Sequence, residues 1–203
     1  MLRRFHNNYA HVSHRKSYRF APLVGRRCSH MQALGLSFLR SWLSTIGFAI
    51  AGLAVVLACS PLADRVAARL VHKPPSLAAF RMLQESRSKL FVGIVLAWVF
   101  GGFLEELLLR GIIVQRVERL MSPWLVKPMA TAIAVSTAAA GAGLIHLYQG
   151  LRAAIIITQL SLLFGALFVA SGYNLWAVIL CHGLYDTIAF LRFGRRRSKY
   201  SNV

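Results

Sequence analysis

The chain has 203 residues, of which 57% are hydrophobic and only 15% are charged. Soluble globular domains contain about 45–50% apolar and about 25% charged residues, so this composition disfavours a soluble domain and excludes a disordered or fibrous chain. The three cysteines are odd in number and have no metal-binding spacing, and they do not imply a disulfide scaffold.

The net charge of +18 results from 24 basic residues and only six acidic ones. Thirteen of the basic residues lie in residues 1–40 and 192–199, and most of the others lie between apolar runs. Basic residues that flank apolar runs are typical of proteins at an anionic lipid surface. No motif for RNA or DNA binding is present, so we expect membrane lipids and not nucleic acid as partners.

Residues 1–40 form a basic segment that precedes the first apolar run. Residues 1–30 contain seven Arg or Lys, and the first acidic residue of the chain is Asp64. An Arg-rich segment without acidic residues is typical of an organellar transit peptide. Two other interpretations stay open: a basic disordered tail resting on lipid headgroups, or sequence upstream of the true start codon.

An apolar helix needs about 20 residues to cross the hydrocarbon core of a membrane. The candidate spans are residues 41–59, 90–115, 128–147, 153–171 and 174–191. These runs predict an all-α, multi-pass transmembrane bundle of about five helices, which makes the chain an integral membrane protein.

The segments between the runs suggest four parts of the chain. After 1–40, residues 41–89 comprise the first span and a basic loop with a short amphipathic helix around 63–71. Residues 90–191 form the main helical bundle, in which 116–127 is a basic loop, and 192–203 form a basic tail. The third span has eight consecutive small residues at 136–143, so we expect it to lie inside the bundle.

A few ionisable residues interrupt the apolar runs. They are Glu105, Glu106, Arg110, His146, His182 and Asp186. A charged side chain at the centre of a membrane helix costs about 2.5–3.5 kcal/mol on insertion scales. Four unpaired charges at that depth would cost on the order of 10 kcal/mol, as much as the whole stability of a typical domain. These groups must therefore face one another or a wet cavity.

Helical spacing assigns partners to these residues. Glu106 and Arg110 are four apart, as are His182 and Asp186, so each pair shares a helix face. Glu105 lies about 100° around the helix from Glu106 and is the better candidate for a free, reactive carboxylate. The alternatives are that Glu105 reaches water at the membrane edge and that His146 is a packing histidine.

In chain order these residues read as EExxxR at 105–110, a histidine that ends a small-residue helix, and then HxxxD at 182–186 after Asn174-Leu175-Trp176. The pattern resembles the CPBP/Abi family of intramembrane proteases, to which the CAAX prenyl endopeptidases belong, over about residues 95–190. Ala142 stands where the family has phenylalanine, which would remove an aromatic wall from the site, and Asp186 stands where asparagine is commoner.

The resemblance implies an intramembrane endopeptidase that hydrolyses a peptide bond of a membrane-associated peptide or lipidated protein. Glu105 would be the general base that activates water, and His146 would help to hold that water. His182 and Asp186 would stabilise the oxyanion; because an ionised carboxylate cannot donate, we assign Asp186 to orienting His182. Glu106 and Arg110 would support the site.

A metal is not required by a glutamate mechanism, although Glu105, His146 and His182 could hold Zn²⁺ with an open position. The sequence contains no HExxH motif.

Two other functions are kept beside the peptidase. One is a non-proteolytic family member that acts as a membrane scaffold or protective partner. The other, less favoured because the five spans show no broken-helix symmetry, is a proton-coupled transporter.

Overall fold

The computed structural model describes residues 41–195, and all regular structure within them is helical. The helices in chain order are α2 (Trp42–Leu70), η1 (Ala78–Gln84), α3 (Arg87–Leu96), η2 (Ala97–Glu105), η3 (Leu107–Val114), α4 (Gln115–Met121), α5 (Lys127–Ile145), η4 (Leu147–Gln149), α6 (Leu151–Ala170) and α7 (Leu175–Arg195). The predicted targeting segment at 1–30 and most of the basic tail lie outside the described residues.

Five of these helices are long and apolar enough to cross a membrane, which confirms the predicted all-α, five-span fold. They are α2, the continuous helix Arg87–Met121 from α3 to α4, α5, α6 and Leu175–Gly194 of α7. Many large apolar side chains on them point outward; Leu43 is 82% exposed and Phe91 is 68% exposed. Such side chains are expected on helices that face lipid.

The first helix is longer than predicted. It continues through Pro61 to Leu70, so the amphipathic segment expected around 63–71 is the last part of α2 and the loop begins after it. The buried residues of α2, Thr45, Ala49, Gly52, Val56, Ala63 and Ala67, form one stripe on both sides of the proline. Arg152 of α6 donates to Asp64 at 2.6 and 3.0 Å. Packing of this stripe thus outweighs the helix-breaking tendency of Pro61.

The second span is also longer than the predicted 90–115. It begins after Ser86, whose hydroxyl accepts from the backbone N–H of Lys89 as an N-cap, and it ends only at Met121. The residues expected to begin a loop at 116 are helical because Glu118 is bound by neighbouring elements, accepting from Thr131 at 2.6 Å and from Tyr173 at 2.8 Å. The connection to α5 is therefore only residues 122–126.

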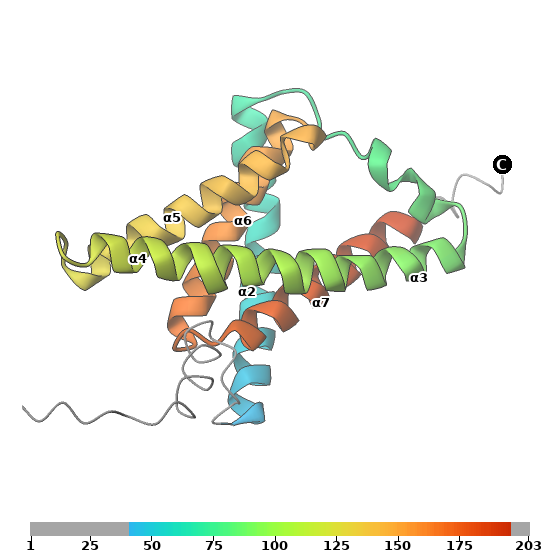
Figure 1. The fold of residues 1–203 in the computed structure, drawn as a ribbon. Helices are drawn as coiled ribbons and strands as arrows, with labels where there is room; N and C mark the ends of the chain where they lie inside the picture. Colours follow the sequence, from blue (N-terminus) through green and yellow to red (C-terminus); the bar gives the residue numbers. More distant parts are fainter. Residues whose placement is uncertain (1–40, 196–203) are drawn as a thin grey trace, which may run out of the picture.

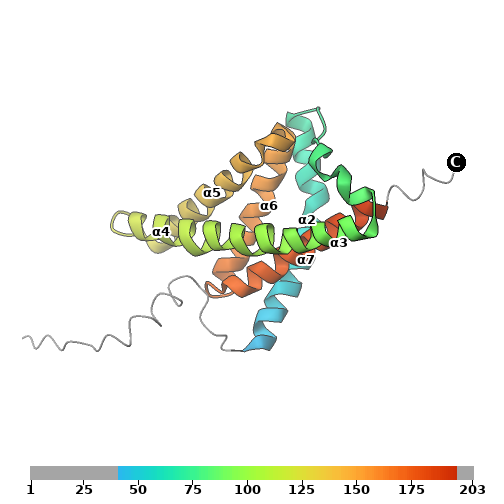
Figure 2. The same cartoon turned by 45° about the vertical axis from the view of Figure 1, so that its right-hand side comes forward.

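The helices cross at steep angles. In Figure 1, α2 and α6 run in opposite directions through the centre, and the α3–α4 helix passes in front of them. The turned view in Figure 2 shows the same crossing, with α7 below the long helix and η1 beside its α3 end. α7 packs directly on η2, because a Cβ added to Gly102 would lie 3.5 Å from the backbone of Gly183.

The small-residue helix α5 is buried on one face only. Its buried residues are Ala130, Ala134, Ala138, Ala139, Ala142 and Gly143. A Cβ at Gly143 would lie 2.8 Å from the carbonyl oxygen of Ala154, so glycine is needed for the close approach of α5 and α6. Met129 and Leu144 on the same helix are 54% and 65% exposed. The prediction that α5 lies inside the bundle thus holds for its small-residue face.

Candidate active site

A cavity of about 770 Å³ lies where η1, η2, η4 and α5 to α7 meet. All four residues predicted to be catalytic line it: Glu105, His146, His182 and Asp186. Residues that are far apart in sequence therefore share one cavity, as the cost of placing charges in lipid requires.

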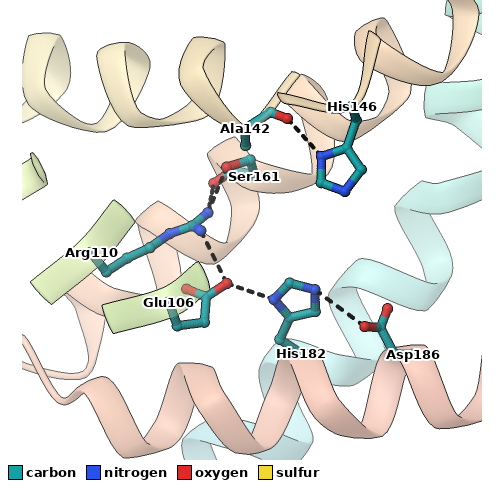
Figure 3. Close-up of polar contacts among 7 residues, drawn as sticks. All are labelled: Glu106, Arg110, Ala142, His146, Ser161, His182 and Asp186. Carbon is teal, nitrogen blue, oxygen red and sulfur yellow. Dashed lines mark hydrogen bonds and ion pairs between the residues drawn. The ribbon is translucent and has the colours of Figure 1, made fainter. Parts of the chain in front are cut away.

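A buried ion pair lies at the wall of the cavity. Arg110 Nη1 donates to Glu106 Oε1 at 3.0 Å, and the two side chains are 1% and 0% exposed. The second guanidinium nitrogen, Nη2, donates to the backbone oxygen of Ser161 at 2.7 Å and to its hydroxyl at 2.6 Å. Figure 3 shows this network between η3 and α6. The spacing of the EExxxR motif predicted the pair, whereas Ser161 carries no signal in its apolar run.

His182 is held by Glu106. Its Nδ1 lies 2.6 Å from Glu106 Oε1, and its ring stacks on Phe164 with centroids 4.7 Å apart and an interplanar angle of 18°. Asp186 Oδ2 lies 3.6 Å from His182 Nε2, which is beyond hydrogen-bond distance. The hydrogen bond that orients His182 therefore comes from Glu106, and Asp186 faces the other ring nitrogen (Figure 3).

His146 ends α5 on the opposite wall of the cavity. Its Nδ1 lies 2.8 Å from the carbonyl oxygen of Ala142, one turn earlier. A carbonyl oxygen only accepts, so Nδ1 carries a proton, and in this tautomer Nε2 is the acceptor nitrogen. Ala142 itself is fully buried in the core and does not line the cavity. The described cavity has an aromatic wall from another helix, because Phe164 of α6 lines it beside His182.

Glu105 differs from its neighbour Glu106. It is half-buried, it lines the cavity, and it forms no hydrogen bond or ion pair within the described part of the chain. Glu105 is the last residue of the π-helical segment η2, and Glu106 lies between η2 and the second π-helical segment, η3; no sequence pattern predicted these segments. Such i→i+5 turns are frequent at functional sites. The two adjacent carboxylates thus have separate surroundings, one in the cavity and one in the core.

Small residues let α7 approach η2 at the site. A Cβ at Gly101 would lie 2.9 Å from Asp186 Oδ2, and a Cβ at Gly183 would lie 2.5 Å from the ring of Trp98. Trp98 Nε1 also donates to Thr187 at 3.0 Å. These residues position Asp186 and His182 relative to η2, and no pattern in the sequence distinguishes them.

The proposed zinc ligands do not form a metal site. Among residues 41–194, no group of three or more His, Cys, Asp and Glu side chains is close enough to hold a metal ion. As arranged in the described residues, the donor set of Glu105, His146 and His182 does not fit a metal.

A family model described as type II CAAX prenyl endopeptidase Rce1-like matches residues 87–188, half of the chain, including all six predicted site residues. The chain belongs to the Rce1-like family. This confirms the family resemblance seen in the sequence. The Rce1-like family is a peptidase family, and with five apolar helices the chain is an integral membrane protein. No curated protein and no solved structure matches the chain.

Proposed function

We propose that this Rce1-like protein is an intramembrane endopeptidase that hydrolyses a peptide bond of a membrane-associated substrate with water activated by Glu105. One observation carries the proposal: Glu105, His146, His182 and Asp186, from three separate spans, line one cavity of about 770 Å³. A water molecule and a peptide group fit within a space of that size.

Glu105 is the proposed general base. Its carboxylate has no competing hydrogen bond within the described residues, so its lone pairs are available to a water molecule. His146 Nε2, left as an acceptor by the Nδ1 contact with Ala142, orients the second hydrogen of that water. The water oxygen attacks the carbonyl carbon, its proton moves to Glu105, and the same proton passes to the leaving amine when the C–N bond breaks.

His182 is the proposed oxyanion donor. Glu106 lies at Nδ1 of His182 and Asp186 lies beyond Nε2, so a carboxylate faces each ring nitrogen. These two carboxylates would balance the positive charge of a protonated His182 ring. The Nε2–H of that imidazolium points into the cavity and donates to the oxyanion as it forms. Glu106 fixes the ring, Arg110 donates to Glu106, and Ser161 accepts from Arg110 and so holds the guanidinium in place.

The cavity wall favours an apolar or lipidated substrate. Its apolar side is lined by Leu77 and Phe80 near η1, Phe100 of η2, and Phe190 and Phe193 of α7. Phe80 and Phe190 contact each other with ring centroids 5.6 Å apart. A hydrophobic segment or a lipid chain bound here would bring a neighbouring peptide bond to the polar side. The family description, CAAX prenyl endopeptidase, agrees with this class of substrate.

The purified chain in lipid vesicles tests the proposal with apolar and lipidated peptides. We expect cleavage by the wild type, loss of cleavage in Glu105→Ala and His146→Ala, and normal cleavage in the control Glu85→Ala, whose carboxylate is exposed at the surface. Equal turnover by all variants would contradict it. A biological effect and partner binding that survive Glu105→Ala and His182→Ala would instead favour a non-proteolytic scaffold.

A further inference from the structure

A second hollow, of about 500 Å³, lies where the end of α4, the start of α5 and Tyr173 meet. In Figure 1 these ends of α4 and α5 are at the far left, whereas η1, beside the catalytic cavity, is at the right. The hollow is lined by two cations, Arg119 and Lys127, and by the neutral side chain of Gln115. It has no part in the proposed peptidase chemistry.

Neither cation has a carboxylate partner in the described chain. The chain has only six acidic residues, all within residues 41–195. Five of the six carboxylates have a partner or a place elsewhere in the structure. Asp64, Glu85 and Glu106 pair with Arg152, Lys89 and Arg110, and Glu105 and Asp186 line the catalytic cavity. Arg119 reaches only the side-chain oxygen of Gln115, at 3.4 Å.

The remaining acid, Glu118, lines the hollow but is already bound. It accepts from Thr131 at 2.6 Å and from the Tyr173 hydroxyl at 2.8 and 2.9 Å. These hydrogen bonds hold the carboxylate against α5 and the α6–α7 turn, and they occupy its oxygens. The hollow therefore presents two cations that an incoming anion can pair with.

The surroundings of the hollow indicate its depth in the membrane. Residues 122–126 connect two candidate spans and must leave the hydrocarbon core there. On this connection Trp124 is 82% exposed and Val126 is 65% exposed, and Leu120 just before it is 65% exposed. Exposed tryptophan beside basic residues is typical of the headgroup level of a bilayer.

We infer that this hollow binds the phosphate of an anionic phospholipid headgroup through Arg119 and Lys127. A free phosphate offers the same charge, but it would gain nothing from the exposed apolar residues beside the cations. A phospholipid can place its phosphate between the cations and its acyl chains against Leu120, Trp124 and Val126. Basic pockets between membrane helices bind headgroups of this kind.

The test uses the full chain in detergent, stripped of lipid, titrated with phosphatidylglycerol or phosphatidylcholine and observed by native mass spectrometry. We expect tighter binding of phosphatidylglycerol. The double variant R119Q/K127Q should weaken it roughly 25-fold, about fivefold for each cation. Charge-conserving R119K/K127R should retain most of the affinity, and melting temperatures should show that every variant is folded.

The matched control is K73Q/R87Q, which removes two exposed cations from other parts of the chain. Its net charge therefore equals that of R119Q/K127Q. Its affinity for phosphatidylglycerol should equal that of the wild type. Equal affinity for the two lipids, or an equal loss in the control, would overturn the inference. Displacement of the lipid by millimolar inorganic phosphate would show that the hollow takes a free anion, which also contradicts it.

Discussion

Glu106 Oε1 lies 2.6 Å from His182 Nδ1, although the two residues are 76 positions apart. The same oxygen accepts from Arg110 Nη1 at 3.0 Å. One buried carboxylate therefore connects the ion pair of the second span to the histidine of the last span. This makes Glu106 the residue on which both the packing of α7 and the orientation of His182 depend.

Replacing Glu106 by glutamine should destabilise the protein strongly. The guanidinium of Arg110 would remain buried without a compensating charge, and loss of one partner of a buried pair costs about 3–5 kcal/mol. Thermal melting in detergent measures the effect. Glu85→Gln, which breaks the exposed pair with Lys89, should cost about 1 kcal/mol or less. An E106Q protein that melts like the wild type would contradict the structural role assigned to Glu106.

The contact between α7 and η2 should not tolerate a methyl group. Gly183→Ala would place a Cβ 2.5 Å from the Trp98 ring, and overpacking of this kind costs about 1–3 kcal/mol. Gly47→Ala is the matched control, because nothing lies within 4 Å of a Cβ at that helical position. It should be neutral or stabilising, since alanine favours helix by about 0.5–1 kcal/mol over glycine. Equal melting temperatures for the two variants would refute the close approach.

Tyr173→Phe should lower the free energy of unfolding in a pH-dependent manner. The lost hydroxyl donates to both oxygens of Glu118, and a hydrogen bond to a charged group contributes about 1.5–3 kcal/mol. Burial and the hydrogen bond to Glu118 raise the pKa of Tyr173 above its ordinary value of about 10.

The raised pKa fixes the sign of the effect. Below about pH 10 the phenol is intact in both the folded and the unfolded chain, so the full contribution of Tyr173 is present. As the pH rises further, the Tyr173 phenol ionises first in the unfolded chain, where its pKa is lower. The stabilisation of the wild type by this hydroxyl is therefore lost as the pH rises from the pKa of the unfolded chain to that of the folded chain. Urea unfolding from pH 7 to 11 should show the gap between wild type and Y173F closing above pH 10. A gap that widens there would contradict the prediction.

The sequence predicted which residues gather at the cavity better than it predicted the helix ends. The cost of charge in lipid required the ionisable groups of the spans to face one another or a wet cavity, and Glu105, His146, His182 and Asp186 all line one cavity. Helical spacing also predicted the Glu106–Arg110 pair. Periodicity within one helix cannot show contacts between helices, so it assigned His182 to Asp186, four residues away, and missed Glu106.

Helix ends were mispredicted where tertiary contacts decide them. Pro61 marks a helix end by local rules, but the buried stripe of α2 continues past it against α6. Glu118 lies in a stretch that is basic and looks like a loop, but Thr131 and Tyr173 bind it and the helix extends to Met121. Ser161 was missed for a related reason, since a single serine in an apolar run does not reveal that a buried arginine binds it.

The most direct test of the central claim is the single-turnover rate of peptide cleavage by Glu105→Gln in lipid vesicles, beside its melting temperature. Because Glu105 has no hydrogen-bond partner within the described residues, the variant should melt like the wild type. Loss of a general base should slow cleavage by at least about 100-fold. A folded Glu105→Gln protein that cleaves at the wild-type rate would contradict the assignment of Glu105 as the residue that activates water.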